Sequence, residues 1–358
     1  MLKLPGLIDP HVHLRTPGQS HKEDFYTGTS AALAGGYTTI IDMPNNQIPI
    51  TTLAAFEEKK EIAKKEIVCD VGFHFGSLGE KFEEFANVYK NVFGLKIYLN
   101  QTTGNYFVDE KVFEKICKGW PSTITDCKAD QFQKPILVHA EEDVLESIIQ
   151  IAHDTEQKLH VCHVSSEKEL RIIMKAKEKR FKITCGVTPH HLFLTVEDEK
   201  KLGSFGKMKP SLKSKIDQDF LWNNLSYIDI VESDHAPHTL EEKQLSNVPF
   251  GVPGLETTLP LLLTAVHDKK LTINDIRRLC HDDAAEIFNI KTDPQTFIEI
   301  DENEEYVIKN ENLFTKCKWS PFHGWKVKGK VKSVTIRGTK VFEDGKIIIN
   351  PGFGKILS

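Results

Sequence analysis

Histidine and aspartate side chains form a compact cluster near the start of the chain. Residues 9–15 read Asp-Pro-His-Val-His-Leu-Arg, so one valine separates His11 from His13. On a β-strand, residues two positions apart point to the same face, and two imidazoles on one face can share a metal ion. An isolated His-x-His pair is also found as two ordinary polar residues at a strand end. This cluster alone leaves both interpretations open.

Further residues able to bind metal ions stand at the ends of other short apolar runs. They are Lys96 in GLKIYL, His139 in LVHAEE, His163 in HVCHVSS and Asp234 in SDHAPH. Any one of the histidines is more often a core residue satisfied by a hydrogen bond. Five separate strand ends that each offer a nitrogen or oxygen ligand are difficult to explain by core packing. Together they favour a metal centre built from several strands.

Lys96 is unusual because it lies inside an apolar run, where a charged side chain is costly unless it is neutralised or reaches water. One interpretation is a lysine whose apolar stem lets the ammonium group extend to solvent. The other is a lysine carbamate, formed with carbon dioxide, which replaces the cation by an anion. The two carbamate oxygens would be able to bridge two metal ions.

Short apolar runs rich in β-forming residues must hold these side chains. Amphipathic segments with helical spacing, such as 53–65, 141–153 and 167–179, lie between them. This alternation predicts an α/β fold, a (β/α)8 barrel of the TIM type, with an open doubly wound sheet as the alternative. We favour the barrel because ligand-type residues stand at the strand ends, where a barrel places its active site. The predicted strands are residues 6–13, 37–43, 68–75, 93–99, 135–140, 159–164, 181–187 and 228–233.

Two segments depart from this alternation. Residues 121–134 are polar and irregular, which predicts a surface excursion before the fifth strand. From Lys326 onward, apolar and polar residues alternate between glycine turns, a pattern typical of antiparallel strands. We therefore expect a barrel over residues 1–325 and a small β appendage, built mainly from the C-terminal tail and packed on the barrel, over residues 326–358.

Composition excludes several classes of protein. The 358 residues include 46 Lys plus Arg and 51 Asp plus Glu, for a formal net charge of −5. A general nucleic-acid or anionic-membrane binder would carry a basic excess instead, and no apolar run reaches the length of a membrane span. The seven cysteines are scattered and the N-terminus is unlike a signal peptide. We expect a cytoplasmic protein with free thiols.

Several motifs are shared with a known family. The runs HVHLR, MPN at residues 43–45, GLKIYLN, VHAEE, CHVSS, PHHLFL and SDHAPH together resemble the amidohydrolase superfamily. More narrowly they resemble the dihydroorotases, and most of all the dihydroorotase domain of the animal multifunctional pyrimidine-synthesis protein. The resemblance covers residues 5–352. It implies a zinc-dependent hydrolase of cyclic amides that interconverts N-carbamoyl-L-aspartate and L-dihydroorotate in de novo pyrimidine biosynthesis.

The resemblance also assigns metal-binding roles. It implies two Zn²⁺ ions per chain, bridged by Lys96 in its N6-carboxylated form. Imidazole nitrogen and carboxylate oxygen are suitable zinc ligands, and two neighbouring metals can hold a bridging hydroxide while they polarise a carbonyl. The residues at matching positions are His11 and His13 for the more buried zinc, His139 and His163 for the second zinc, and Asp234 for the first.

Asp234 matches the family's proton carrier as well as a metal ligand. In the implied hydrolysis, metal-bound hydroxide attacks the ring carbonyl, and Asp234 takes the hydroxide proton and delivers it to the leaving nitrogen. Ring closure requires Asp234 to be protonated at the start. We therefore expect ring closure to be favoured at lower pH and ring opening at higher pH.

Other matching positions would contact the substrate. Arg15 can bind the unreactive carboxylate bidentately, together with Asn45 and His238; a surface arginine and a Pro-Asn turn are the alternatives. Pro253 and Gly254 match a loop whose backbone reads the amide edges of the ring, with a Pro-Gly turn without function as the alternative.

A possible lid and two further histidines complete the candidate site. Residues 100–109 are similar to the family's mobile lid, with Thr102 as the substrate contact; a lid would exclude water, and an ordinary loop is the alternative. His190 and His191 are interpreted as structural residues around the site, not as metal ligands.

Three positions depart from the family pattern. Thr16 replaces an acid, Lys209 replaces an arginine and Gly186 replaces a glutamate of similar relatives. Lysine lacks the fork of arginine, so any contact by Lys209 is expected to be weaker. The metal-binding residues do not depend on these positions, and we expect activity with an altered affinity.

Two other functions share parts of this pattern. A dihydropyrimidinase or allantoinase would need the same metal ligands, but its substrate gives no role to Arg15. A non-catalytic scaffold domain would have no physical reason to keep polar groups converging on one cavity. The expected partners are the small-molecule substrate, a second copy of the chain in a homodimer and aspartate carbamoyltransferase; no nucleic acid and no membrane are expected.

Overall fold

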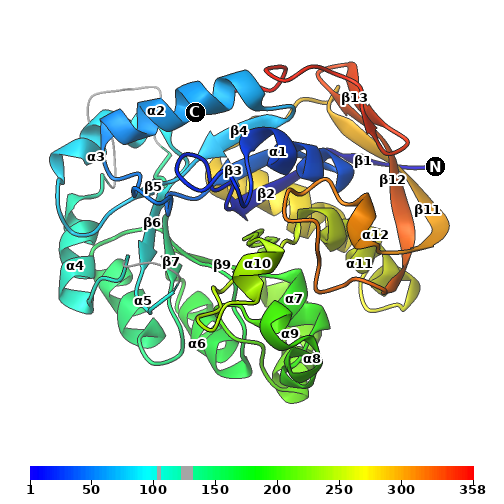
Figure 1. Cartoon of the computed structure of the whole chain (residues 1–358). Helices are drawn as coiled ribbons and strands as arrows, with labels where there is room; N and C mark the ends of the chain where they lie inside the picture. Colours follow the sequence, from blue (N-terminus) through cyan, green and yellow to red (C-terminus); the bar gives the residue numbers. More distant parts are fainter. Residues whose placement is uncertain (103–105, 122–131) are drawn as a thin grey trace.

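A ring of parallel strands forms the centre of the protein (Figure 1), as seen in a computed structural model that describes residues 1–102, 106–121 and 132–358. Each predicted barrel strand contains an observed strand, so the predicted (β/α)8 barrel is confirmed. The third predicted strand is split at His74 into two short strands. The barrel strands are β2 (Leu7–Val12), β3 (Tyr37–Asp42), β4 (Asp70–Phe73), β5 (Phe75–Gly76), β6 (Leu95–Tyr98), β7 (Ile136–His139), β8 (Leu159–Val161), β9 (Ile183–Val187) and β10 (Ile230–Val231).

The ring closes between its first and last strands. One parallel sheet contains β2, β3 and β4, and the other runs from β5 to β10. A parallel bridge pairs Val12 with His235, and the backbone N–H of His13 donates to the carbonyl of His235 at 2.8 Å. Because parallel strands all end at the same rim, this closure brings the residues after β2 beside the residues after β10.

Helices surround the strands and begin at side-chain caps. Ser166 caps α6 and forms a capping box with Glu169, and Thr52 caps α2. Such caps satisfy the free N–H groups at a helix start and fix where the helix begins. The helices are α1 (Phe25–Ala34), α2 (Leu53–Glu66), α3 (Glu83–Val88), α4 (Glu110–Gly119), α5 (Leu145–Asp154), α6 (Glu167–Glu178), α7 (Pro189–Phe193), α8 (Val196–Leu202), α9 (Lys215–Asn223), α10 (Leu240–Lys243), α11 (Leu255–His267), α12 (Ile273–Arg277) and α13 (Asp283–Phe288).

An antiparallel sheet is attached beside α11. Its order is β1 (Leu2–Pro5), β11 (Phe297–Val307), β12 (Lys326–Ile336), β13 (Thr339–Glu343) and β14 (Lys346–Ile347), and β12 packs against α11. The sheet takes strands from both ends of the chain, so it includes residues outside the 326–358 segment that we expected. Residues 301–305 of β11 are polar and mostly charged, which hides the alternation of this strand in the sequence.

Apolar side chains fill the barrel below the polar rim. Ile8, Ile41, Leu137 and Ile230 come from four different strands and are fully or almost fully buried, and Phe288 of α13 packs with them. This layer supports the polar residues at the strand ends. Among the described residues, no helix has both the length and the apolar character needed to cross a membrane. Most of the predicted excursion at 121–134 lies outside the described residues.

Candidate metal centre

The first group of metal-binding residues joins the two ends of the barrel seam. His11 lies in β2, His13 follows that strand, and Asp234 follows β10. The Asp234 Oδ1 atom lies 3.1 Å from His13 Nε2 and 3.4 Å from His11 Nε2. All three side chains are buried, and one ligand atom from each lies within 4.8 Å of the others. The structure thus brings these predicted ligands together.

The second group contains His139 at the end of β7 and His163 just after β8. His139 Nδ1 and His163 Nε2 face each other at 3.0 Å in a buried position. Of the other ring nitrogens, His163 Nδ1 has no hydrogen-bond partner among the described residues, and His139 Nε2 lies 3.6 Å from a Glu141 oxygen. The two groups adjoin, since the ring centres of His11 and His163 are 5.3 Å apart.

Lys96 in β6 is buried beside both groups, with 1% of its surface exposed. Among the described residues, its ammonium donates one hydrogen bond, to the Cys162 thiol at 3.1 Å, and pairs with no carboxylate. Burial lowers the pKa of His139 and of His163, and the charge of Lys96 adds a smaller lowering to the pKa of each. A buried cation with a thiol as its acceptor is costly, and a carbamate at Nζ would remove that cation.

These residues fit zinc by their atom types and spacing. Imidazole nitrogen and carboxylate oxygen are common zinc ligands, and two nitrogens bound to one tetrahedral zinc lie about 3.3 Å apart. Within each of the two groups, the facing ligand atoms lie 3.0 to 3.4 Å apart. Each group therefore presents its atoms at the spacing that neighbouring ligands of one ion would have.

The charge states of His13, His163 and Asp234 also suit metal binding. Burial lowers the pKa of His13 to about 4 and that of His163 well below its ordinary value, so both rings are neutral at pH 7. Neutral imidazole is the form that binds metals. Burial would raise the pKa of Asp234, but the charge of His11 and the hydrogen bond from His13 hold that pKa below its usual range. Asp234 is therefore a carboxylate at neutral pH.

Three residues around the centre have left-handed backbone conformations. Arg15 has a φ of 63°, His163 of 40° and Asp234 of 44°. Positive φ is uncommon outside glycine, costs energy, and is concentrated at functional sites. The local backbone is therefore held in place by the contacts of the surrounding side chains.

A pocket opens beside the histidines that we predict to bind metal. Among the predicted substrate contacts, Arg15, Asn45 and Thr102 line it. Asn45 Oδ1 lies 2.6 Å from His13 Nδ1. The remaining lining residues are His11, His13, Tyr98, His139, His163, Lys209, Asp234, Ala236, Phe250 and Gly251.

The other predicted contacts lie behind this pocket. His238 is fully buried, with its Nε2 3.2 Å from a terminal nitrogen of Arg15. Pro253 and Gly254 line a separate small cavity, and the Gly254 N–H donates to His235 Nδ1 at 3.2 Å. The structure therefore places His238 against Arg15, and the Pro253–Gly254 turn against His235.

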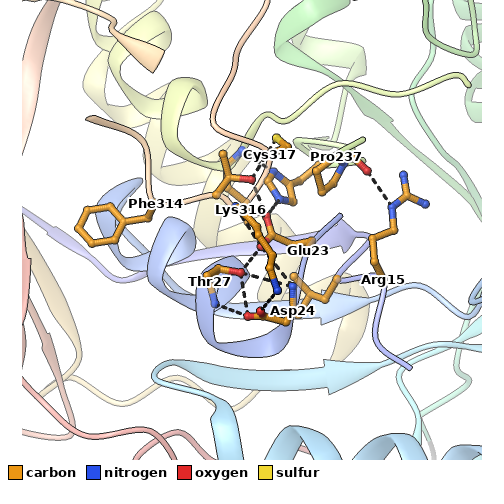
Figure 2. A network of polar contacts seen from close by, with 12 residues as sticks. Arg15, Glu23, Asp24, Thr27, Pro237, Phe314, Lys316 and Cys317 are labelled. Carbon is orange, nitrogen blue, oxygen red and sulfur yellow. Dashed lines mark hydrogen bonds and ion pairs between the residues drawn. The ribbon is translucent and has the colours of Figure 1, made fainter. Parts of the chain in front are cut away.

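Arg15 is anchored at the edge of a second polar cluster. Figure 2 shows its Nε donating to the Pro237 carbonyl, at 3.1 Å, near a network centred on Glu23. Thr16, the position where similar relatives have an acid, donates through its hydroxyl to the Glu23 carbonyl at 3.3 Å. Arg15 is buried, with only 6% of its surface exposed. Among the described residues it nevertheless forms no ion pair. Its charge is thus available to a ligand.

The two departures on the far side of the centre have different surroundings. Lys209 lines the pocket with its Nζ 3.8 Å from a Glu141 oxygen. A Cβ atom on Gly186 would lie 2.5 Å from the Glu232 Oε1 atom. His191 uses both ring nitrogens, with Thr188 Oγ1 at 2.7 Å and the Pro210 carbonyl at 3.1 Å.

Sequence reasoning missed Glu232 and Cys162. Glu232 is fully buried after β10, and its Oε2 lies 3.0 Å from His11 Nδ1. Its charge raises the pKa of His11 to about 10, against the lowering by burial. Cys162 contacts Lys96, and its sulfur lies within 4.8 Å of ligand atoms of His11 and Glu232. The available signal was a glutamate directly after an apolar run and directly before SDHAPH.

Candidate metal ligands at the strand ends of a barrel are the arrangement in which such a fold places its active site. Residues 2–190 match the Amidohydrolase family, and the chain belongs to this family. It is 38% identical over 367 residues to the dihydroorotase of Pyrococcus horikoshii. The aligned region covers 99% of this chain and 84% of that protein.

Two further proteins show the range of similarity. The chain is 40% identical over 361 residues to the multifunctional protein CAD of Squalus acanthias, and spans 99% of its own length but 16% of that protein. Its fold is similar to the L-hydantoinase (dihydropyrimidinase) of Arthrobacter aurescens, with a TM-score of 0.90, 25% identity and coverage of 99% and 88% of the two chains.

Proposed function

We propose that this chain is a dihydroorotase, which converts N-carbamoyl-L-aspartate reversibly into L-dihydroorotate and water. The observation that carries the proposal is one pocket lined both by the metal-binding histidines and by Arg15. Such a pocket can hold the reacting amide at the metals and the unreactive carboxylate at the arginine. The similarity to the dihydroorotase of Pyrococcus horikoshii supports the same reaction.

The donor set suits two zinc ions, with Lys96 as a carbamate between them. His11, His13 and Asp234 would hold one ion, and His139 and His163 the other. When bound, the ions polarise a carbonyl and lower the pKa of a water molecule. The absence of a carboxylate partner for Lys96 within the described part of the chain supports the carbamate.

Asp234 moves the proton. Its depressed pKa makes it a carboxylate at neutral pH, so it can take a proton from water during ring opening. It then gives that proton to the ring nitrogen as the carbon–nitrogen bond breaks. Ring closure runs these steps backwards and begins with protonated Asp234. Parallel pH profiles for the two directions would contradict this role.

Arg15 distinguishes this reaction from the hydrolysis of uncharged cyclic amides. A buried guanidinium that pairs with no carboxylate among the described residues is stabilised by an anionic ligand, and its fork matches a carboxylate. Asn45, Thr102 and, through Arg15, His238 complete this end of the pocket, while the Pro253–Gly254 backbone is proposed to read the ring edges. Dihydropyrimidinase substrates lack that carboxylate and would leave the charge unpaired.

Two associations belong to the same proposal. CAD is a multifunctional protein of which this chain matches one part, which supports association with aspartate carbamoyltransferase, the source of N-carbamoyl-L-aspartate. A homodimer is the second proposed association, and light scattering of the purified chain tests it.

The test is hydrolysis of L-dihydroorotate by the purified chain, followed by absorbance, with metal analysis of the same sample. We expect turnover with two zinc ions per chain, and loss of turnover in Asp234→Ala. Two bound metals without turnover would redirect the search to hydantoin, dihydrouracil and allantoin. Absence of both metal and turnover would contradict the proposal in favour of a non-catalytic scaffold.

A further inference from the structure

The side chain of Glu232 touches both groups of metal-binding residues. Its Oε2 lies 3.0 Å from His11 Nδ1, and its Oε1 accepts the backbone N–H of His163. Glu232 has no exposed surface and lies 3.8 Å from His160 Nε2. One carboxylate therefore contacts a residue of each group from behind, on the side away from the facing ligand atoms.

The His11 contact leaves the correct nitrogen free. His11 Nδ1 faces Glu232, while His11 Nε2 faces Asp234 at 3.4 Å. A carboxylate on one ring nitrogen fixes the tautomer and the orientation of a metal-binding histidine, and makes its other nitrogen a stronger ligand. Glu232 is placed to do this for His11.

The His163 contact acts on the backbone instead. His163 has a φ of 40°, a left-handed conformation that is costly for a residue with a side chain. The hydrogen bond from its N–H to Glu232 fixes that peptide. This orients the ring whose Nε2 faces His139.

Space for this carboxylate comes from the neighbouring strand. Ile230 of β10 pairs with Gly186 of β9, and a Cβ on Gly186 would lie 2.5 Å from Glu232 Oε1 and 2.6 Å from its Cδ. Any side chain at position 186 would displace the carboxylate. Gly186 and Glu232 therefore form one unit: Glu232, which follows β10, fills the space that a side chain at position 186 would need.

We propose that Glu232 is a positioning residue that orients His11 and His163 and so links the two metal sites. This inference rests on the proposed function, because it assumes that the two groups hold metal ions. It adds a residue that does not itself contact the substrate or the reacting atoms.

A competing role for Glu232 is direct metal binding. His11, Cys162 and Glu232 offer ligand atoms within 4.8 Å of one another. We favour positioning because the other carboxylate oxygen of Glu232, Oε1, already accepts the backbone N–H of His163, and Cys162 accepts a hydrogen bond from Lys96. Metal stoichiometry separates the two roles.

The experiment measures metal affinity in the whole chain. Apo-protein is titrated with Co²⁺ alone and followed by visible absorption, and bound zinc is counted separately. Glu232→Gln keeps the shape of the side chain but removes its charge, and we expect a 10- to 100-fold weaker metal affinity, as for other residues that support metal ligands, with an altered cobalt spectrum.

A double variant tests whether the carboxylate itself is needed. Glu232→Ala empties the space beside position 186, and Gly186→Asp returns a short acid to it from β9. We expect the double variant to bind Co²⁺ more tightly than Glu232→Ala alone.

Glu169→Gln is the matched control: Glu169 is 2% exposed, bonds to Ser165 and Ser166, and contacts none of the proposed ligands within the described residues. Its metal affinity should equal that of the wild type.

The outcomes separate this inference from the proposed function. Wild-type chain without metal contradicts both. Two metals in the wild type and an unchanged affinity in Glu232→Gln overturn the positioning role alone. A third metal in the wild type that is lost in Glu232→Gln also overturns it and makes Glu232 a ligand. If Glu232→Gln does not fold, the double variant decides: a folded double variant that binds metal no better than Glu232→Ala overturns the inference.

Discussion

Two buried polar clusters lie side by side at the rim of the barrel, and they differ in how their members are paired. In the cluster around Glu23, donors face acceptors: the carboxylate accepts hydrogen bonds from the Thr27 and Thr315 hydroxyls and from the Lys316 N–H (Figure 2). In the metal centre, groups able to bind a metal face one another instead: the ring nitrogens of His139 and His163 lie 3.0 Å apart, and Asp234 faces His11 and His13. A self-satisfied cluster stabilises the fold, whereas facing ligand atoms are suited to a species bound between them.

The largest expected effect comes from the metal centre and concerns catalysis. Asp234→Asn keeps the size of the side chain but removes the group that accepts the proton. We expect kcat to fall by about 10²–10⁴-fold, the usual contribution of a general acid or base, in both reaction directions. Steady-state rates with L-dihydroorotate and with N-carbamoyl-L-aspartate check this, and a fall of less than tenfold would place the proton transfer on another residue.

Removal of metal should change stability through the same centre. Ligands that bind only the folded state stabilise it by about 2.7 kcal/mol when their free concentration is 100 times the Kd. We expect a chelator to lower the Tm of the wild type and to have a smaller effect on His139→Ala, which has lost one predicted ligand. Equal shifts in the two proteins would mean that His139 does not bind the metal.

The Glu23 cluster should show the opposite behaviour. Glu23→Gln removes a charged acceptor from buried hydroxyl and backbone donors, and hydrogen bonds to charged groups contribute about 1.5–3 kcal/mol each. We expect urea titrations without metal to show that the free energy of unfolding falls by about 2–3 kcal/mol. The affinity for zinc should stay unchanged. A loss of zinc affinity instead would show that the two clusters are coupled.

A smaller effect is expected from Glu256, which extends the Glu23 cluster to the C-terminal part of the chain. Its carboxylate accepts the N–H groups of Phe314 and Thr315, and burial raises its pKa to about 7 from 4.5. The folded chain therefore holds this proton more tightly than the unfolded chain, and stability falls as pH rises from about 4.5 to about 7.

Glu256→Gln should lack this loss because its side chain does not ionise. We expect the stability difference between variant and wild type to move in favour of the variant by about 2 kcal/mol between pH 5 and pH 7, the part of the full pKa shift that this range covers. Urea titrations at pH 5 and pH 7 measure it. A constant difference would show that Glu256 is ionised in the folded chain.

The smallest effect belongs to the exposed edge of the Glu23 cluster. The Lys316 ammonium pairs with Asp24 at 2.6 Å, but 38% of the lysine side chain and 22% of the aspartate side chain are exposed. Exposed pairs contribute about 0–1 kcal/mol, so Lys316→Met should change unfolding free energy by less than about 1 kcal/mol. A larger loss would assign this edge a structural role equal to that of Glu23.

The sequence predicts the barrel well because each strand is a short apolar run bounded by polar residues. It does not predict the split at His74 or the contribution of β1 to the appendage, whose pairing of Leu2 with Ile300 joins distant residues. Nothing local in the first five residues indicates that partner.

The site shows the same limit. His11, His13, Lys96, His139, His163 and Asp234 are found from residue type and position at strand ends. Glu232 is missed because its role depends on the register of β9 and β10, which places Gly186 beside it. The turn at Pro253 and Gly254 is placed by its contact with His235, which the sequence does not indicate.

The seam between β2 and β10 gives metal binding a further meaning. His13 and Asp234 are 221 positions apart in the chain and face each other only when the last barrel strand has docked against the first. Bringing such distant segments together has an entropic cost, and an ion held by both residues would act as a crosslink that offsets it. Metal uptake would then report the completion of folding, and a chain interrupted before β10 would lose the first metal site however well its earlier strands had assembled.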